Sequence, residues 1–304
     1  MSKEIRRASS PQFKKNIRTV RMMTGSMGFD ENMGKVNWKA VRLISGIGYK
    51  FMPKEKGVRF KKYRLGNVSF EMATPQKLTS KNIIVYVHGG GFVSGSASSS
   101  RGYCSMVAAY SGCRVAALDY SLAPENPFSN GFNDCCNAVE RLGSLFKDAK
   151  LALVGESAGG NLCAALALKY KNKISSVTLH SPFLDFTGGL DRSLHKINDF
   201  TVKVGCLKPL NSIYVGKSRP DGPFVLPRYG DFTGFPPTFI TCDSNETLYA
   251  DSEWIYTELS RLGIDVHIVE MKGAFHAFAT IGTGSPETKQ ILTHNIAFIK
   301  KNFR

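Results

Sequence analysis

The sequence of 304 residues has no long hydrophobic segment. Its longest uninterrupted apolar stretch runs from Leu162 to Leu168, whereas a membrane-spanning helix needs roughly 18 such residues. We therefore expect no transmembrane segment. The basic residues that follow Met1 are not succeeded by a hydrophobic stretch of the kind found in secretory signals, so the cytoplasm is the expected location.

The sequence also lacks the cysteine spacing of a disulfide-rich or zinc-binding protein. Its seven cysteines are odd in number, include no Cys-x-x-Cys pair, and stand at positions 104, 113, 135, 136, 163, 206 and 242. Small secreted disulfide proteins and structural zinc sites use other patterns. We expect reduced, buried thiols and no metal site, with the vicinal pair Cys135-Cys136 inside a helix.

Acidic residues are scarce at the N-terminal end. Residues 1–62 carry 16 Lys and Arg against 4 Asp and Glu, and the rest of the chain carries 24 against 20. Such a segment could attract an anionic membrane or nucleic acid, but it contains no basic patch interleaved with aromatic residues, so no nucleic-acid partner is expected. Apolar residues within it recur at helical spacing, which predicts an amphipathic helix packed by that stripe. The stripe consists of Val36, Ala40, Leu43, Ile44, Ile47 and Phe51.

The remaining chain has the pattern of an α/β fold. Residues 58–65 and 68–73 predict an antiparallel strand pair around the turn-forming Gly66-Asn67. Six apolar runs of strand length follow and alternate with helical stretches, which is typical of a mostly parallel sheet covered on both faces. The runs are 83–87, 114–118, 151–154, 177–179, 238–241 and 266–269. The helical stretches include 104–110, 131–146, 158–170, 246–262 and 286–300.

Residues 185–225 interrupt this alternation with a polar and glycine-rich stretch. The interruption predicts an insertion between two strands. Because an insertion after the carboxyl end of a strand stands over the region where α/β sheets bind ligands, we expect a lid there.

The strongest motif is Gly155-Glu156-Ser157-Ala158-Gly159, placed between the apolar run 151–154 and an Ala/Leu-rich helix. A sharp turn from strand to helix exposes such a serine as a nucleophile, and the small residues Gly155 and Gly159 permit the close approach of neighbouring chain. The helix N-terminus would also favour negative charge beside Ser157. The alternative is a tight glycine turn with a non-catalytic serine.

A second motif, His88-Gly89-Gly90-Gly91-Phe92, follows the run 83–87. Consecutive glycines usually mark backbone that must approach something closely. The amides of Gly90 and Gly91, together with that of Ala158, are predicted to stabilise an oxyanion. The alternative is a flexible or phosphate-binding loop, but no Lys-Ser or Lys-Thr follows as in a P-loop.

The expected base is His276, which follows the run 266–269 in a loop at the carboxyl edge of the predicted sheet. The acid that orients it should lie between Ser157 and His276 in the chain. Asp243, Glu246 and Asp251 all follow the run 238–241, and spacing alone leaves the three open.

With these motifs in this order, residues 56 to 304 resemble the hormone-sensitive-lipase-like branch of the α/β-hydrolases, which includes many small bacterial acyl esterases. The resemblance also rests on Ser181-Pro182 and on the stretch 119–128. It implies an α/β-hydrolase fold with a helical cap from residues 1–55 and 186–225, over a core of residues 56–185 and 226–304. In that family the acid lies about 30 positions before the histidine, which favours Glu246. The sequence departs from the usual pattern at Glu156 and Ala277.

The function that follows is hydrolysis of short to medium acyl esters through Ser157, His276 and Glu246, by way of an acyl-enzyme and without a cofactor. His88, Gly89, Gly155 and Gly159 would support this site. The expected partner is a small-molecule ester, and the oligomeric state is open and includes a homodimer. Two alternatives remain: an interfacial lipase at anionic membranes, and a non-catalytic ligand-binding relative of the fold.

Overall fold

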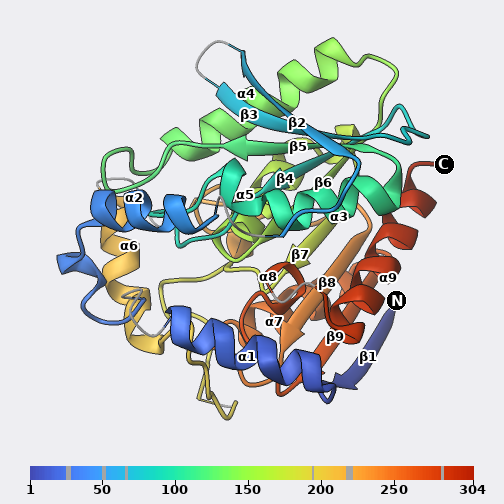
Figure 1. The fold of residues 1–304 in the computed structure, drawn as a ribbon. Coiled ribbons are helices and arrows are strands. Elements are labelled where there is room, and N and C mark those ends of the chain that lie inside the picture. Colours follow the sequence, from blue (N-terminus) through green and yellow to red (C-terminus); the bar gives the residue numbers. More distant parts are fainter. Residues whose placement is uncertain (25–28, 50–52, 66–67, 194, 217–221, 282–283) are drawn as a thin grey trace.

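A computed structural model describes residues 1–24, 29–49, 53–65, 68–193, 195–216, 222–281 and 284–304 (Figure 1). The strands are β1 (Ser2–Arg7), β2 (Val58–Leu65), β3 (Val68–Pro75), β4 (Ile83–Val87), β5 (Arg114–Asp119), β6 (Leu151–Glu156), β7 (Ile174–His180), β8 (Thr238–Asp243) and β9 (Val266–Lys272). Within the described residues they form one sheet in the order β1-β9-β8-β7-β6-β4-β5-β3-β2. Neighbours run parallel from β1 to β5, and β3 and β2 add antiparallel pairs. The predicted fold class is confirmed.

Alternate side chains of the central strands enter different parts of the core. In β4, Ile83, Val85 and Val87 belong to one buried cluster, while Ile84 and Tyr86 belong to another. Successive side chains of a strand point to opposite faces, so a strand that is apolar at every position must be covered on both. The continuous apolar runs of the sequence therefore follow from the burial of both sheet faces.

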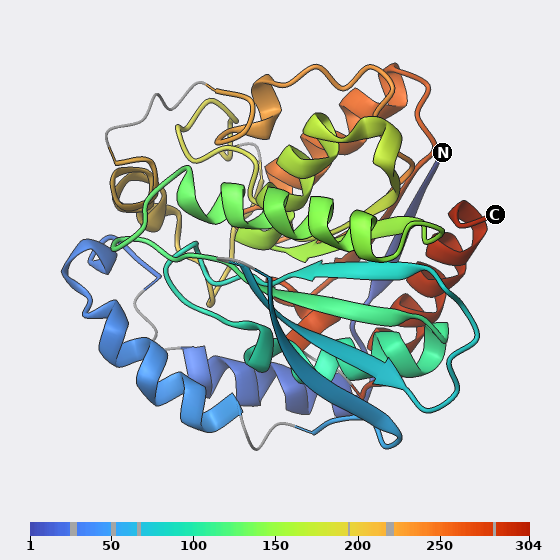
Figure 2. The same ribbon diagram turned by 90° about the horizontal axis from the view of Figure 1, so that it is seen from above.

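Helices cover these two faces. The cluster on one face includes residues of α4 (Asn130–Leu145), α5 (Ala158–Lys169) and α7 (Tyr249–Arg261). The cluster on the other includes residues of α3 (Arg101–Ser111) and α9 (Pro286–Asn302). Figure 2 shows the two helical layers on either side of the sheet.

Three further helices, α1 (Pro11–Thr24), α2 (Trp38–Tyr49) and α6 (Leu207–Val215), come from the segments that the sequence assigns to a cap. Figures 1 and 2 show α2 and α6 at the same end of the molecule, away from the two chain termini. The division of the chain into cap and core otherwise stays a prediction.

The strands predicted from the sequence start at Val58, but the sheet also contains β1, which the sequence did not predict. β1 pairs in parallel with β9 along its whole length, from Ser2 opposite His267 to Arg7 opposite Lys272. The sequence gives no apolar alternation there, since β1 is an edge strand whose side chains are mostly exposed. Backbone hydrogen bonds hold such a strand, and charged side chains are typical of sheet edges.

The predicted packing of the amphipathic helix is also wrong. α2 forms, but Leu43 and Ile44 are 70% and 71% exposed, while Trp38 is buried. The orientation is set by tertiary contacts: the Trp38 Nε1 donates to the carbonyl of Met33, and the Arg42 guanidinium donates to the carbonyls of Val93 and Ala123. The side chain of Ile47 and all of Phe51 lie outside the described residues.

Other expectations are confirmed. β2 and β3 pair antiparallel, although the Gly66-Asn67 turn itself lies outside the described residues. All seven cysteines are free and buried. No helix in the described part of the chain is long and apolar enough to cross a membrane.

Candidate active site

Ser157 stands at the turn between β6 and α5, with the unusual backbone angles φ 52° and ψ −120°. Positive φ is strained for a residue with a Cβ and persists only where the surroundings enforce it. Here the amide of Ser157 donates to the carbonyl of His180, at 2.9 Å, and its carbonyl accepts from the amide of Phe183, at 3.1 Å. Gly159 completes the turn, because a Cβ at that position would collide with the backbone carbonyl of Val87.

The glycine loop after β4 lies against this turn. The amide of Gly89 donates to the Glu156 Oε1 at 3.3 Å. Gly90 has φ +110°, which L side chains rarely adopt, and its carbonyl accepts the amides of Val93 and Ser94. The loop therefore has a fixed conformation that requires glycine.

His88, at the start of the glycine loop, is held by contacts with Tyr120. Its ring stacks on Tyr120 with centroids 4.3 Å apart, and the Tyr120 hydroxyl donates to the His88 carbonyl at 2.9 Å. Burial lowers the pKa of His88, so its imidazole is held neutral. These contacts give His88 a packing role at the base of the glycine loop.

His276 lies in the loop between β9 and the short helix α8 (Phe278–Ile281). Its Nδ1 is 2.8 Å from the Glu246 Oε2, and both side chains are buried. The loop is fixed at Ala277, whose amide donates to the Ser181 hydroxyl at 3.0 Å. Ser181 belongs to the Ser-Pro pair of the sequence, which here supports the segment that carries His276.

The charges of this pair shift both pKa values. Burial lowers the pKa of His276, but the hydrogen bond and negative charge of Glu246, with smaller contributions from the charges of Asp199 and Glu156, outweigh burial and hold the pKa above its ordinary value. Burial raises the pKa of Glu246, and the hydrogen bond with His276 opposes that rise. A carboxylate on Nδ1 fixes the tautomer that leaves Nε2 free to accept a proton.

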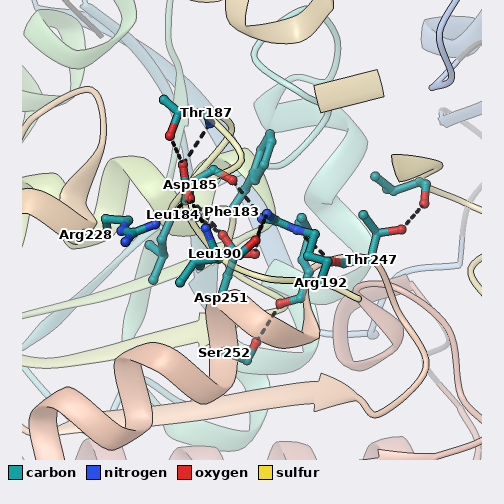
Figure 3. Close-up of polar contacts among 12 residues, drawn as sticks. Phe183, Leu184, Asp185, Thr187, Leu190, Arg192, Arg228, Thr247, Asp251 and Ser252 are labelled. Atoms are coloured by element: carbon teal, nitrogen blue, oxygen red, sulfur yellow. Dashed lines mark hydrogen bonds and ion pairs between the residues drawn. The ribbon is translucent and has the colours of Figure 1, made fainter. Parts of the chain in front are cut away.

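The other two candidate acids have different partners. Asp243 accepts a long hydrogen bond from the amide of Ala274 at 3.4 Å, and burial together with the charge of Glu246 raises its pKa to about 7. Asp251 accepts from the Arg192 Nη2 at 2.6 Å and from the amides of Leu184 and Asp185, at 2.8 Å each (Figure 3). Of the three acids, Glu246 is the one that hydrogen-bonds His276.

Figure 3 shows that Asp251 belongs to a polar network that anchors the insertion to the core. Arg192, within the insertion, also donates to the carbonyls of Asp185 and Thr247. Arg228 donates to the Asp185 Oδ2 at 2.7 Å. Charged groups so deeply buried require partners of this kind, and the network fixes where the insertion begins relative to α7.

Ser157 and His276 both line a cavity of about 320 Å³. Core residues Gly90 and Gly91 line it as well, so the structure brings four of the predicted site residues to one cavity. Ala158, the first residue of α5, follows Ser157 directly and is fully buried. The lining also includes apolar side chains from the N-terminal and inserted segments, namely Val20, Phe29, Val202, Cys206 and Leu210.

Two carboxylates near the site, the half-buried Glu156 and the buried Asp199, had not been predicted to belong to it. Glu156 links the serine turn to the glycine loop through Gly89 and to α8 through the Thr280 hydroxyl. Asp199 enters from the insertion, and one of its oxygens, one Glu246 oxygen and one ring nitrogen of His276 all lie within 4.8 Å of one another. Glu156 was visible as an unusual residue in the serine motif, whereas nothing local distinguishes Asp199 from other polar residues of the insertion.

The comparisons with known proteins all indicate the same family. A family model described as alpha/beta hydrolase fold matches residues 84–280. An esterase of Acinetobacter venetianus is 27% identical over 250 residues, which cover 80% of this chain and 82% of the relative. An acetyl-hydrolase of Streptomyces hygroscopicus is 25% identical over 242 residues, which cover 78% of this chain and 81% of the relative. The crystal structure of an esterase from the bacterial hormone-sensitive lipase family aligns with a TM-score of 0.87 at 25% identity, over 98% of this chain and all of that one.

Proposed function

The chain belongs to the α/β-hydrolase family, as a hormone-sensitive-lipase-like carboxylic ester hydrolase, and we propose that Ser157, His276 and Glu246 carry out the hydrolysis. The observation that carries this assignment is the 2.8 Å contact between the His276 Nδ1 and the Glu246 Oε2, in the cavity that Ser157 also lines. A nucleophile, a base and an orienting acid are the groups that a serine acyl-enzyme mechanism needs.

In the proposed reaction His276 takes the hydroxyl proton of Ser157 as Oγ attacks the acyl carbonyl. The amides of Gly90, Gly91 and Ala158 donate to the oxyanion, and Glu246 stabilises the imidazolium. His276 then gives the proton to the leaving alcohol. Water attacks the acyl-enzyme with His276 as base once more, which releases the acid and restores Ser157.

The substrate class proposed here is a short to medium acyl ester. The cavity of about 320 Å³ is closed partly by apolar side chains such as Val202 and Leu210, which would exclude water from the acyl chain. The free state of all seven cysteines supports the expected cytoplasmic location, where thiols stay reduced.

The test is a series of p-nitrophenyl esters of increasing acyl length, hydrolysed by wild type and by Ser157→Ala. We expect activity that is greatest on short or medium chains and is lost in the variant. Full activity of a folded Ser157→Ala variant would overturn the mechanism.

The outward face of α2 favours a second candidate function, hydrolysis at an anionic lipid surface. Leu43 and Ile44 are exposed on α2, which also carries the exposed Lys39, and α1, also in the N-terminal segment, carries four Lys and Arg residues and no acidic one. Exposed apolar side chains beside cationic ones are typical of helices that lie on anionic membranes, where each Lys or Arg contributes about 1 kcal/mol.

This candidate is tested with vesicles that contain phosphatidylserine. The double variant Leu43→Ser, Ile44→Ser should bind them less tightly than wild type, and salt should weaken wild-type binding steeply. Leu145→Ser is the matched control, because Leu145 is 59% exposed but ends α4. Equal binding by all three proteins would exclude the membrane role and leave ester hydrolysis intact.

A further inference from the structure

Asp199 is a buried carboxylate that the proposed mechanism does not use. It lies in the inserted segment, 47 positions before Glu246 in the chain (246 − 199 = 47), and only 7% of it is exposed. One of its oxygens lies within 4.8 Å of a ring nitrogen of His276 and of an oxygen of Glu246. A second carboxylate this close to an imidazole in a buried site interacts strongly with the charge of that imidazole.

Four hydrogen-bond donors hold this carboxylate in place. The Oδ1 accepts the amide of Thr201 at 2.8 Å, the Thr201 hydroxyl at 2.5 Å and the amide of Val202 at 3.1 Å. The Oδ2 accepts the amide of Thr247 at 3.0 Å, and Thr247 directly follows Glu246. The donors balance the negative charge of Asp199, and the bond to Thr247 ties its position to that of the triad acid.

From this geometry we propose that Asp199 is a positioning residue of ester hydrolysis, a second carboxylate that stabilises the imidazolium of His276 from the inserted segment. The inference rests on the proposed roles of Ser157, His276 and Glu246. It implies that the insertion supplies part of the electrostatics of the reaction in addition to covering the cavity. The network around Arg192 and Asp251 would then help to keep Asp199 in register with the site.

Three carboxylates from different parts of the chain act on the charge of His276. Glu246 follows β8, Asp199 lies in the insertion, and Glu156 ends β6. Asp243, the last residue of β8, contacts the loop of His276 through the amide of Ala274. Glu246 makes the direct hydrogen bond and has the largest effect among the charges that raise the pKa of His276, with smaller contributions from Asp199 and Glu156. Removing the charge of Asp199 should therefore lower that pKa without breaking the bond between Glu246 and His276.

The test is the pH dependence of kcat/KM for Asp199→Asn, which keeps the shape of the side chain and removes its charge. Activity needs neutral His276, so the acid limb should move to lower pH, by about 1, as expected for loss of an opposite charge about 4–6 Å away. At the plateau kcat should fall about tenfold, because the imidazolium of the transition state loses a stabilising charge. A purely structural role would lower activity at every pH without moving the limb.

Asp191→Asn is the matched control. Asp191 is exposed in the same insertion and makes the same local turn, since its Oδ1 accepts the amide and the hydroxyl of Ser193 at 2.8 and 2.6 Å. This variant loses the same charge and should leave the limb in place. Asp199→Glu, which restores a carboxylate, should return the limb toward the wild-type position.

A readout that does not need activity separates this inference from the proposed function. In the Ser157→Ala background, the pKa of His276 measured by NMR titration should be lower with Asp199→Asn than without it. If Asp199→Asn does not fold, Asp199→Ser keeps an acceptor for the Thr201 amide and replaces it in both measurements. An unchanged acid limb and an unchanged pKa of His276 would overturn the role of Asp199. If a fluorophosphonate failed to label Ser157 in active wild type, the proposed function itself would fail.

Discussion

Replacing Glu246 by Gln is the sharpest perturbation of the site, because it removes one charge and keeps the shape of the side chain. In the wild type the Glu246 Oε2 accepts from the His276 Nδ1 at 2.8 Å in a buried setting. A glutamine amide can instead donate to Nδ1. That would place the ring proton on Nε2, which could then no longer accept a proton from Ser157.

The expected loss follows from the distance. Two unit charges 2.8 Å apart interact by about 6 kcal/mol at an effective dielectric constant near 20. Since about 1.4 kcal/mol corresponds to a factor of ten in rate, loss of this stabilisation of the imidazolium lowers kcat by about 10⁴-fold. The lost charge also lowers the pKa of His276, so whatever activity remains should have its acid limb at lower pH.

The assay is kcat on a short p-nitrophenyl ester, with thermal unfolding measured on the same samples. Asp243→Asn and Asp251→Asn are the comparison variants, and both should retain far more activity than Glu246→Gln. Asp251→Asn is expected to lose stability instead, because Arg192 would keep a buried charge without its partner, at a cost of about 3–5 kcal/mol. If Asp243→Asn were the most damaging of the three with its fold intact, Glu246 would lose its role.

Three other outcomes are expected. A fluorophosphonate should label Ser157, as seen by peptide mapping, and label on a different serine would remove the central assignment. The pKa of His276 is raised above 6.5, so kcat/KM should decline as the pH drops through a value higher than 6.5, and a limb below 6.5 would contradict the pairing with Glu246. Phe13→Ala should lower the free energy of unfolding by about 3–5 kcal/mol, because Phe13 is fully buried and its ring centroid lies 5.8 Å from that of Phe275. A change below about 1 kcal/mol would show that α1 contributes little to the core.

Local sequence was sufficient for the parts of the fold whose signal lies within a few residues. The central strands could be predicted because burial on both faces requires apolar side chains at every position, as in β4. The serine turn was equally visible, since Gly155 and Gly159 are required by close contacts that few other residues permit. The glycine loop could be predicted for the same reason, since Gly90 has a positive φ that favours glycine.

Tertiary structure decided what local pattern leaves open. β1 has no apolar alternation, because its place at the edge of the sheet depends on backbone hydrogen bonds with β9. α2 leaves Leu43 and Ile44 of its apolar stripe exposed, because Trp38 and Arg42 find their partners elsewhere in the chain.

The same holds for the acids of the site. Asp243, Glu246 and Asp251 stand within nine positions of one another, and their local sequence leaves the choice open, although the spacing of the resembled family favours Glu246. In the structure Glu246 reaches His276, whereas Asp251 reaches Arg192. Asp199 comes close to His276 solely through the path of the insertion. A carboxylate carries the same chemistry wherever it stands in a sequence. Its pKa and its role depend on the donors and charges that the folded chain places around it, many of them distant in sequence.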